Sequence, residues 1–259
     1  MDPVEEFDRQ VHNNVRRLGA DSGLLELTHA WIRKTNEYGY TYNFRWLGRP
    51  IIQYPQDIVA LQELIWEVKP DLIIETGIAH GGSLVMSASM LALLDMCEAI
   101  EKGESMDPAA SRRAVLGVDI DIRSHNRQAI EGHPLASRIR MLQGSSVDPE
   151  TIAQVRTISS AYERVLVCLD SNHTHEHVLS ELEAYAPLTS VGSYCVVFDT
   201  LIEDMPQELF PGRPWGPGNN PKTAVREWLL SHPEFEVDRA LQSKLQITVA
   251  PDGFLRRKR

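Results

Sequence analysis

Two carboxylates and one histidine stand just past the ends of two apolar segments. Asp170 follows the run 164–169, Asp199 follows the run 194–198, and His173 lies three residues past Asp170. Carboxylates that converge at one edge of a sheet suit a hard divalent cation such as Mg²⁺, which takes oxygen ligands. An imidazole titrates near neutral pH, so His173 is a candidate general base. These residues predict metal-assisted proton abstraction, with helix N-capping as the alternative for both carboxylates.

Three histidines, His173, His175 and His177, follow one another at alternate positions. Alternating histidines occur in zinc sites. On a helix, however, His173 and His177 would share a face while His175 would point elsewhere. We therefore expect His173 to act alone and the other two to lie on a solvated helix surface. A solvated helix start is the alternative for His173 as well.

A glycine-rich turn, ETGIAHGGS, runs from Glu75 to Ser83 after the first apolar run of the central region. Gly77 allows a tight turn, and Gly81 and Gly82 would let a ligand approach the backbone. The helix that starts there offers free N–H groups to an anion. The spacing is not the G-x-G-x-x-G of nicotinamide or flavin sites, and the Lys-Ser/Thr of a P-loop is absent. The segment resembles motif I of S-adenosylmethionine (SAM) methyltransferases; a turn that only permits close packing is the alternative.

Two further strand ends extend the predicted cofactor site. A nucleoside cofactor needs a carboxylate at the end of the second strand for its ribose hydroxyls, and Asp119 lies there. Asp119 is farther from Gly77 than the usual ~20 residues, because a long helix and the polar loop 104–113 intervene. Asp121 is a weaker candidate, since it lies past the strand end. Ser146, after the third strand, is placed to line the adenine, with a surface turn as the alternative.

Strands and helices alternate after residue 55, and this alternation must position those side chains. The expected strands are nearly continuous apolar runs, which indicates a parallel sheet covered on both faces. They are 71–76, 114–119, 138–142, 164–169 and 194–198, followed by two last strands at 235–238 and 246–250. Helices are expected at 56–67, 83–101, 124–131, 149–159, 173–185 and 222–230. The prediction is an α/β, Rossmann-like, mostly parallel doubly wound sheet in one domain over residues 56–259.

Residues 1–55 are expected to form a helical and aromatic cover, with helices at 4–18 and 24–36. Aromatic residues cluster between Tyr38 and Trp46. Flat aromatic faces suit the apolar face of a sugar, so this cluster and the loop 201–221 are candidate walls of an acceptor site. A strand or lid packed on the core is the alternative for the aromatic cluster.

Composition narrows the function classes. The chain has 26 basic and 36 acidic residues and a formal net charge of −10, which argues against binding to nucleic acid or an anionic membrane. Its three cysteines form no disulfide framework. The N-terminus lacks a signal-peptide pattern, and the apolar stretch 84–96 is shorter than the ~20 residues of a membrane span. We expect a soluble, cytoplasmic protein.

Six segments of the sequence, taken together, resemble the cephalosporin hydroxylase/rhamnosyl O-methyltransferase family. The resemblance runs from about residue 35 to the C-terminus. They are ETGIAHGGS, GVDID, LDSNH, HVLSELEAYAPLTSVGSYCVVFDT, the GPG at 216–218 and APDGFLRR. The resemblance implies the class I SAM methyltransferase fold, with SAM at the glycine turn, Mg²⁺ at the strand ends and a hydroxyl acceptor. A homo-oligomer is also expected.

Two positions depart from that family's pattern. Members often read LDSDH where this chain has Asn172, and they often carry a glutamate where it has Phe198. The second change removes an expected metal ligand. Thr200, Glu203 and Asp204 are the candidate replacements.

The predicted reaction is SAM-dependent O-methylation of a hydroxyl on a TDP-rhamnose-like deoxysugar in natural-product (antibiotic) biosynthesis. His173 would take the proton and Asp170 and Asp199 would hold the metal. The residues expected to bind SAM are Glu75, Gly77, Gly81, Gly82, Ser83, Asp119 and Ser146. If the acceptor is a nucleotide sugar, its phosphates could meet Arg45, Arg49 or Arg213. The alternatives are an oxidoreductase or hydroxylase of the same family, a non-sugar hydroxyl acceptor, and a SAM-binding scaffold without activity.

Overall fold

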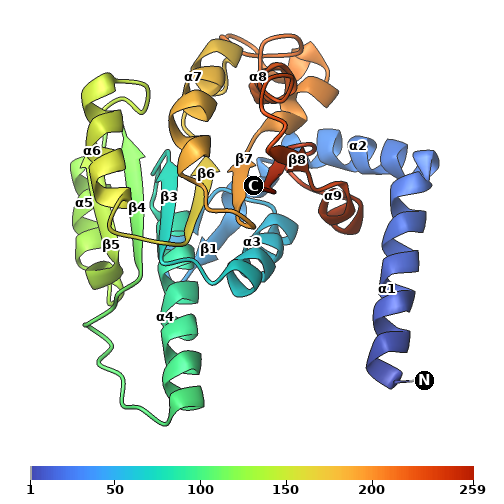
Figure 1. Ribbon diagram of the computed structural model, residues 1–259. Helices are drawn as coiled ribbons and strands as arrows, with labels where there is room; N and C mark the ends of the chain where they lie inside the picture. The colour runs from blue at the N-terminus through green and yellow to red at the C-terminus, as the bar shows by residue number, and fades with distance from the viewer. Residues whose placement is uncertain (1) are drawn as a thin grey trace.

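A seven-stranded sheet forms the centre of the computed structural model, which describes residues 2–259 (Figure 1). The strand order is β5-β4-β3-β6-β7-β9-β8. Strands β3 to β7 are parallel, and β9 pairs antiparallel with both β7 and β8. The strands are β3 (Leu72–Thr76), β4 (Ala114–Asp119), β5 (Ile139–Gln143), β6 (Val165–Leu169), β7 (Tyr194–Val197), β8 (Phe235–Val237) and β9 (Phe254–Arg257). The predicted mostly parallel, doubly wound sheet is confirmed.

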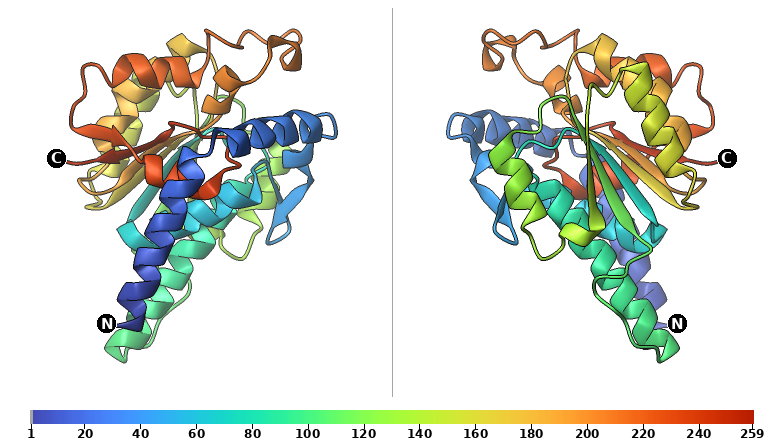
Figure 2. Two further views of the ribbon diagram at one scale, coloured as in Figure 1. Left: turned by 90° about the vertical axis from the view of Figure 1, so that its right-hand side faces the viewer. Right: turned by 90° about the vertical axis from the view of Figure 1, so that its left-hand side faces the viewer.

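Helices cover both faces of this sheet (Figure 2). One apolar core includes residues of α3 (Pro55–Val68), α4 (Gly82–Lys102), α5 (Ser124–Glu131) and α9 (Arg239–Leu245). The other includes residues of α6 (Pro149–Ser159), α7 (His175–Tyr185) and α8 (Pro221–Trp228). Strand β3 contributes side chains to both cores, because successive side chains point to opposite faces of a strand. Ile73 belongs to the first core, and Leu72 and Ile74 belong to the second.

Among the described helices, only α4 is long and apolar enough to cross a membrane. Half of its apolar stretch is buried inside the fold. Its buried residues include Leu84, Leu91 and Leu94, which belong to the first core. This burial is what a core helix shows.

The N-terminal part consists of α1 (Pro3–Ala20), α2 (Ser22–Asn36), a 3₁₀ turn (Tyr40–Asn43) and the hairpin β1 (Phe44–Trp46) and β2 (Arg49–Ile51). Tyr40 makes edge-to-face contacts with Trp31 and Phe44, with ring centroids 5.0 and 5.1 Å apart. The Trp46 indole donates to Ser89 of α4 at 3.0 Å. Most of the aromatic cluster therefore packs on the core, which was the alternative interpretation of this segment.

Parallel register brings the predicted site residues to one edge of the sheet. Thr76, the last residue of β3, pairs with Val118 of β4 and with Leu169 of β6. The next residues along the chain are Gly77, Asp119 and Asp170, respectively. These three residues therefore meet at the carboxyl edge of the sheet, where ligands bind in open α/β sheets.

Two expectations are wrong. The stretch 246–250 is not a strand, because the Val249 N–H donates to the buried Asp57 carboxylate at 2.9 Å instead of to a neighbouring strand. The last strand is β9, after the turn at 251–253. Helix α7 starts at His175 and not at His173, because the Asn172 side chain accepts from the Thr174 N–H at 3.0 Å in a local turn. His173 and His177 consequently share no helix face.

Candidate active site at the carboxyl edge

The glycine turn allows close contact between neighbouring segments of the chain. Gly77 has φ +90°, a left-handed conformation that favours glycine, and a Cβ there would overlap the Asp170 carbonyl oxygen. Gly81 also has a positive φ, and a Cβ at Gly82 would overlap the Pro50 carbonyl oxygen. Packing alone therefore requires glycine at these positions, and contact between Gly81 or Gly82 and a cofactor stays a prediction.

Asp119 ends β4 and faces this turn. Its Oδ2 accepts from the Ile78 N–H at 2.8 Å, and its Oδ1 accepts from the Asp121 N–H at 3.0 Å. Together with Gly77 and Ser146, it lines a cavity of about 140 Å³, here called the cofactor cavity. Backbone donors thus fix this carboxylate at the cavity wall.

Glu75 and Ser83 lie outside the cofactor cavity's lining. The Ser83 hydroxyl donates to the buried Glu75 carboxylate, and burial raises the pKa of Glu75 to about 7. The pair ties the end of β3 to the start of α4. Cofactor binding by these two residues also stays a prediction.

A second side-chain network, which we did not predict, borders the cofactor cavity. His177 Nε2 lies 3.0 Å from Ser146 Oγ and 3.1 Å from Ser171 Oγ. Ser171 donates at 2.7 Å to Glu181, whose side chain is fully buried and whose second carboxylate oxygen has no partner among the described residues. The i, i+4 spacing of His177 and Glu181 on α7 is the sequence signal that could have found this network.

The structure brings the predicted metal ligands and base together. Ligand atoms of Asp170, His173 and Asp199 all lie within 4.8 Å of one another, and His173 Nε2 is 3.1 Å from Asp199 Oδ2. Asp199 has φ +55°, a left-handed conformation that aspartate adopts more readily than most other non-glycine residues. Burial and the neighbouring Asp199 carboxylate raise the pKa of Asp170 well above its usual range. Crowded carboxylates of this kind would be stabilised by a bound cation, so the donor set fits a divalent ion.

None of the candidate replacement ligands is available. The buried Thr200 hydroxyl donates to the Pro251 carbonyl at 2.7 Å. Glu203 accepts from the Gly218 N–H at 2.7 Å. Asp204 pairs with the buried Lys222 at 2.6 Å. Each of these side chains already has a structural partner, so none of them offers the carboxylates a third metal ligand.

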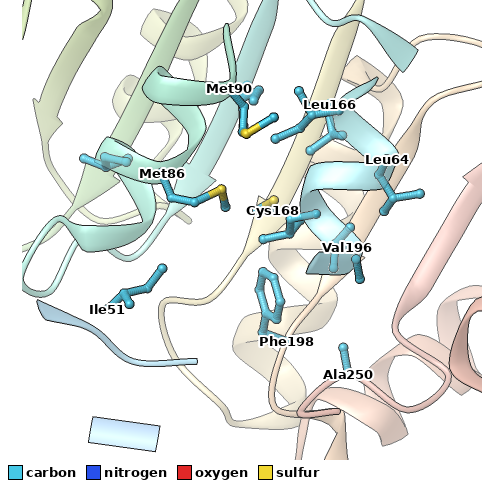
Figure 3. Close-up of a cluster of buried hydrophobic side chains, with 14 of the residues drawn as sticks. Ile51, Leu64, Met86, Met90, Leu166, Cys168, Val196, Phe198 and Ala250 are labelled. Carbon is cyan, nitrogen blue, oxygen red and sulfur yellow. The ribbon is translucent and has the colours of Figure 1, made fainter. Parts of the chain in front are cut away.

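Phe198 lies in the first apolar core. Figure 3 shows its ring among core side chains that include Cys168, Val196 and Ile51. Phe198 is 4% exposed. A phenyl group at this position therefore strengthens the core beneath the site and offers no ligand atom to it.

A larger cavity of about 590 Å³ opens on the other side of the segment 170–173; we call it the acceptor cavity. His173 and Asp199 line it, whereas the adjacent Ser171 and Asn172 line the cofactor cavity. Its other walls come from 36–42, Tyr54, Val249 and the segment 201–215. The loop 201–221 thus contributes as predicted, but Tyr42 is the only aromatic residue of 38–46 that lines the cavity.

Trp215 covers one side of His173. The two rings meet edge to face with centroids 4.8 Å apart, and the Arg213 guanidinium lies 5.1 Å from the Trp215 ring centroid. Arg213 lines the acceptor cavity. Arg45 and Arg49 instead donate to the backbone carbonyls of Gly48 and His80 and do not line that cavity.

Comparison with known proteins gives the family context. A family model described as rhamnosyl O-methyltransferase/CmcI matches residues 38–258. The rhamnosyl O-methyltransferase of Mycobacterium tuberculosis is 31% identical over 204 residues, which cover 77% of this chain and 72% of the relative.

Two solved structures give the fold context. A structure of CmcI with Mg and SAM aligns over 83% of this chain and 77% of its own, with 18% identity and a TM-score of 0.53. This likeness shows that the two proteins share a fold. The apo structure of TDP-rhamnose 3'-O-methyltransferase, an enzyme in calicheamicin biosynthesis, covers 92% of this chain and 90% of its own. Its identity is 15% and its TM-score 0.49.

Proposed function

The chain belongs to the rhamnosyl O-methyltransferase/CmcI family, and from this premise we propose that it is a SAM-dependent sugar O-methyltransferase. The observation that carries the proposal is the cluster of Asp170, His173 and Asp199 between two cavities. One cavity offers hydroxyls and a carboxylate suited to a nucleoside, and the other offers aromatic and apolar walls suited to a sugar.

SAM would be held by Gly77, Asp119 and Ser146, and it would supply an electrophilic methyl group on a sulfonium. The same residues present polar groups for the ribose hydroxyls and the base. The relative CmcI carries Mg and SAM together in a solved structure, which supports testing both ligands here.

His173 would take the proton of the acceptor hydroxyl. A sugar hydroxyl is too weakly acidic to ionise near neutral pH, so a positioned base contributes about 10²–10⁴-fold. Asp199 orients the imidazole through the 3.1 Å contact with Nε2. Asp170 and Asp199 would hold a divalent ion such as Mg²⁺, which would lower the pKa of a bound hydroxyl. The remaining acceleration would come from holding the acceptor oxygen in line with the methyl group.

The acceptor class is a deoxysugar such as TDP-rhamnose, and a natural-product pathway is the proposed setting. Arg213 supports a phosphate-bearing acceptor, because it is a basic residue that lines the acceptor cavity. We further propose that residues 56–259 form the catalytic unit, that residues 1–55 cover it, and that the enzyme acts in the cytoplasm.

Mass spectrometry of an incubation with TDP-rhamnose and SAM tests this function. One added methyl group supports it. An unmodified sugar, tested also as free rhamnose and as a rhamnoside, would overturn the sugar assignment. Calorimetry with SAM and with NADH separates a methyltransferase from the oxidoreductase alternative, since only the former should bind SAM.

A further inference from the structure

Helix α1 carries an apolar stripe that the described residues leave largely exposed. Val4, Phe7, Val11 and Leu18 are all exposed, Phe7 to 64%, and no residue of α1 is buried. With Val15, these residues repeat every three or four positions, the spacing of a helix that packs along another helix. The main contacts of α1 within the chain are with α9, where Gly19 lies against Ser243.

Helix α4 and its neighbours carry a second uncovered apolar surface. It is a groove of about 810 Å³, here called the α4 groove, with a lining that is almost entirely apolar. Leu93 and Met96 of α4 are 45% and 42% exposed, and Leu47 and Met106 add to the same groove. Large exposed apolar patches mark interaction sites.

We propose that the α4 groove receives α1 of a second copy of this chain in a two-fold dimer. Both helices project from the body of the protein in the same direction (Figures 1 and 2). A two-fold axis across that direction would place each α1 along the partner's α4, so that the contact forms twice. Such isologous pairing is the commonest way in which a self-complementary surface closes.

Charges favour this arrangement over others. The last turns of α1 carry Arg16 and Arg17, and the end of α4 and the loop after it carry Glu101, Glu104 and Asp107. The two-fold axis turns α1 of one copy parallel to α4 of the other, which sets these basic and acidic ends side by side. The polar face of α1 mixes acids and bases, unlike the basic face of a helix that binds anionic membranes.

The oligomeric mass in solution tests the proposal, measured by light scattering after size exclusion. The wild-type chain should have an even multiple of 29.2 kDa. Phe7→Glu and Leu93→Glu should each give a monomer, because either change places a charge in the apolar contact. Leu230→Glu is the matched control, since Leu230 is an exposed leucine elsewhere on the surface, and it should leave the mass unchanged.

A mixture of the two variants gives a sharper result. Phe7→Glu keeps an intact α4 groove and Leu93→Glu keeps an intact α1, so the mixture should regain dimers through one intact contact. Reversing the charge of Arg16 and Arg17 should weaken the dimer, and reversing Glu101 and Glu104 as well should restore it. Unchanged circular dichroism and thermal unfolding would show that each variant folds.

Three outcomes would overturn the proposal. If the wild-type chain is a monomer at 100 μM, the proposed interface does not form. Loss of the dimer in Phe7→Glu but not in Leu93→Glu would assign α1 to pairing with another α1. Binding of wild-type α1 to anionic vesicles, lost in Phe7→Glu while the oligomeric mass is unchanged, would assign the stripe to a membrane.

Discussion

The cofactor cavity and the acceptor cavity meet at the segment 170–173 but are built in different ways. The cofactor cavity, of about 140 Å³, takes its walls from residues that directly follow parallel strands and from the start of α7. The acceptor cavity, of about 590 Å³, takes most of its walls from 3₁₀ turns and irregular segments. Sheet register therefore fixes the first cavity, whereas loop packing fixes the second. Under the proposed function, we expect acceptor choice to vary more than cofactor geometry, because loops vary more than the elements they connect.

Substitution at the glycine turn should have the largest effect and should fall on the cofactor side. Gly77→Val should abolish SAM binding, because its side chain would overlap the Asp170 carbonyl oxygen at a left-handed φ. Calorimetry with SAM measures the loss. Gly48→Val is the control, since Gly48 has φ +89° but no neighbouring atom within 4 Å; equal losses in both would mean that backbone strain and not the overlap is responsible.

His173 lies on the acceptor side, and its removal should affect turnover and not cofactor affinity. His173→Ala should lower kcat by about 10²–10⁴-fold, the contribution of a positioned base, with the Kd for SAM nearly unchanged. His175→Ala serves as the control, because His175 contacts Thr223 and Glu227 and lines neither cavity. Unchanged turnover in His173→Ala would exclude it as the base.

Asp199 tests the proposed metal site between the two cavities. Asp199→Asn should weaken Mg²⁺ or Mn²⁺ binding by about 100-fold, since even the loss of a group that orients a metal ligand typically costs 10–100-fold. Calorimetry with the metal alone gives a readout independent of activity. Asp121→Asn changes an exposed carboxylate near the same edge and should leave affinity unchanged. If the wild-type protein binds no divalent ion, Asp170 and Asp199 would be cofactor or acceptor contacts instead.

The network behind Ser146 should have a smaller effect, confined to the cofactor. His177→Ala removes the contact that Ser146 and Ser171 share and should raise the Kd for SAM about tenfold, which is ~1.4 kcal/mol. The value of kcat at saturating SAM should stay within a few-fold. A lower kcat with an unchanged Kd would instead place His177 in the acceptor chemistry.

The same contrast between the two cavities explains which parts of the structure could be predicted from the sequence. Continuous apolar runs predicted β3, β4, β6 and β7 to within a residue, and strand ends in a parallel sheet necessarily meet at one edge. Asp119, Asp170 and Asp199 could therefore be placed from sequence alone. The acceptor walls could not, because they depend on contacts between distant segments. Val249, for example, is held out of a strand by Asp57, a residue far earlier in the chain. His177 was wrongly expected on a solvated helix surface, because its contacts with Ser146 and Ser171 join segments that follow different strands.

The smallest expected effect is on the pH dependence of stability. It comes from buried carboxyl groups behind both cavities. Asp57 accepts from Thr248 and Val249 at the acceptor wall, and burial raises its pKa from 3.8 to about 7. Folding therefore takes up a proton between these pH values. The resulting stabilisation is complete below about pH 4 and is lost as the pH rises through 7.

Asp57→Asn removes this titration and should flatten the fall of Tm between pH 4 and 8, by a few degrees relative to the wild-type chain. Thermal unfolding of both proteins across this range measures the difference between their Tm values. Asp95 and Glu98, whose pKa values are lowered, give stability the opposite pH dependence. Both proteins contain these two residues, so their effect cancels when the two Tm values are subtracted. Glu75 behind the cofactor cavity has a pKa raised in the same direction, so the variant should retain part of the slope. Parallel curves for the two proteins would show that Asp57 stays ionised in the fold, held by its two donors, and that the acceptor wall is insensitive to pH.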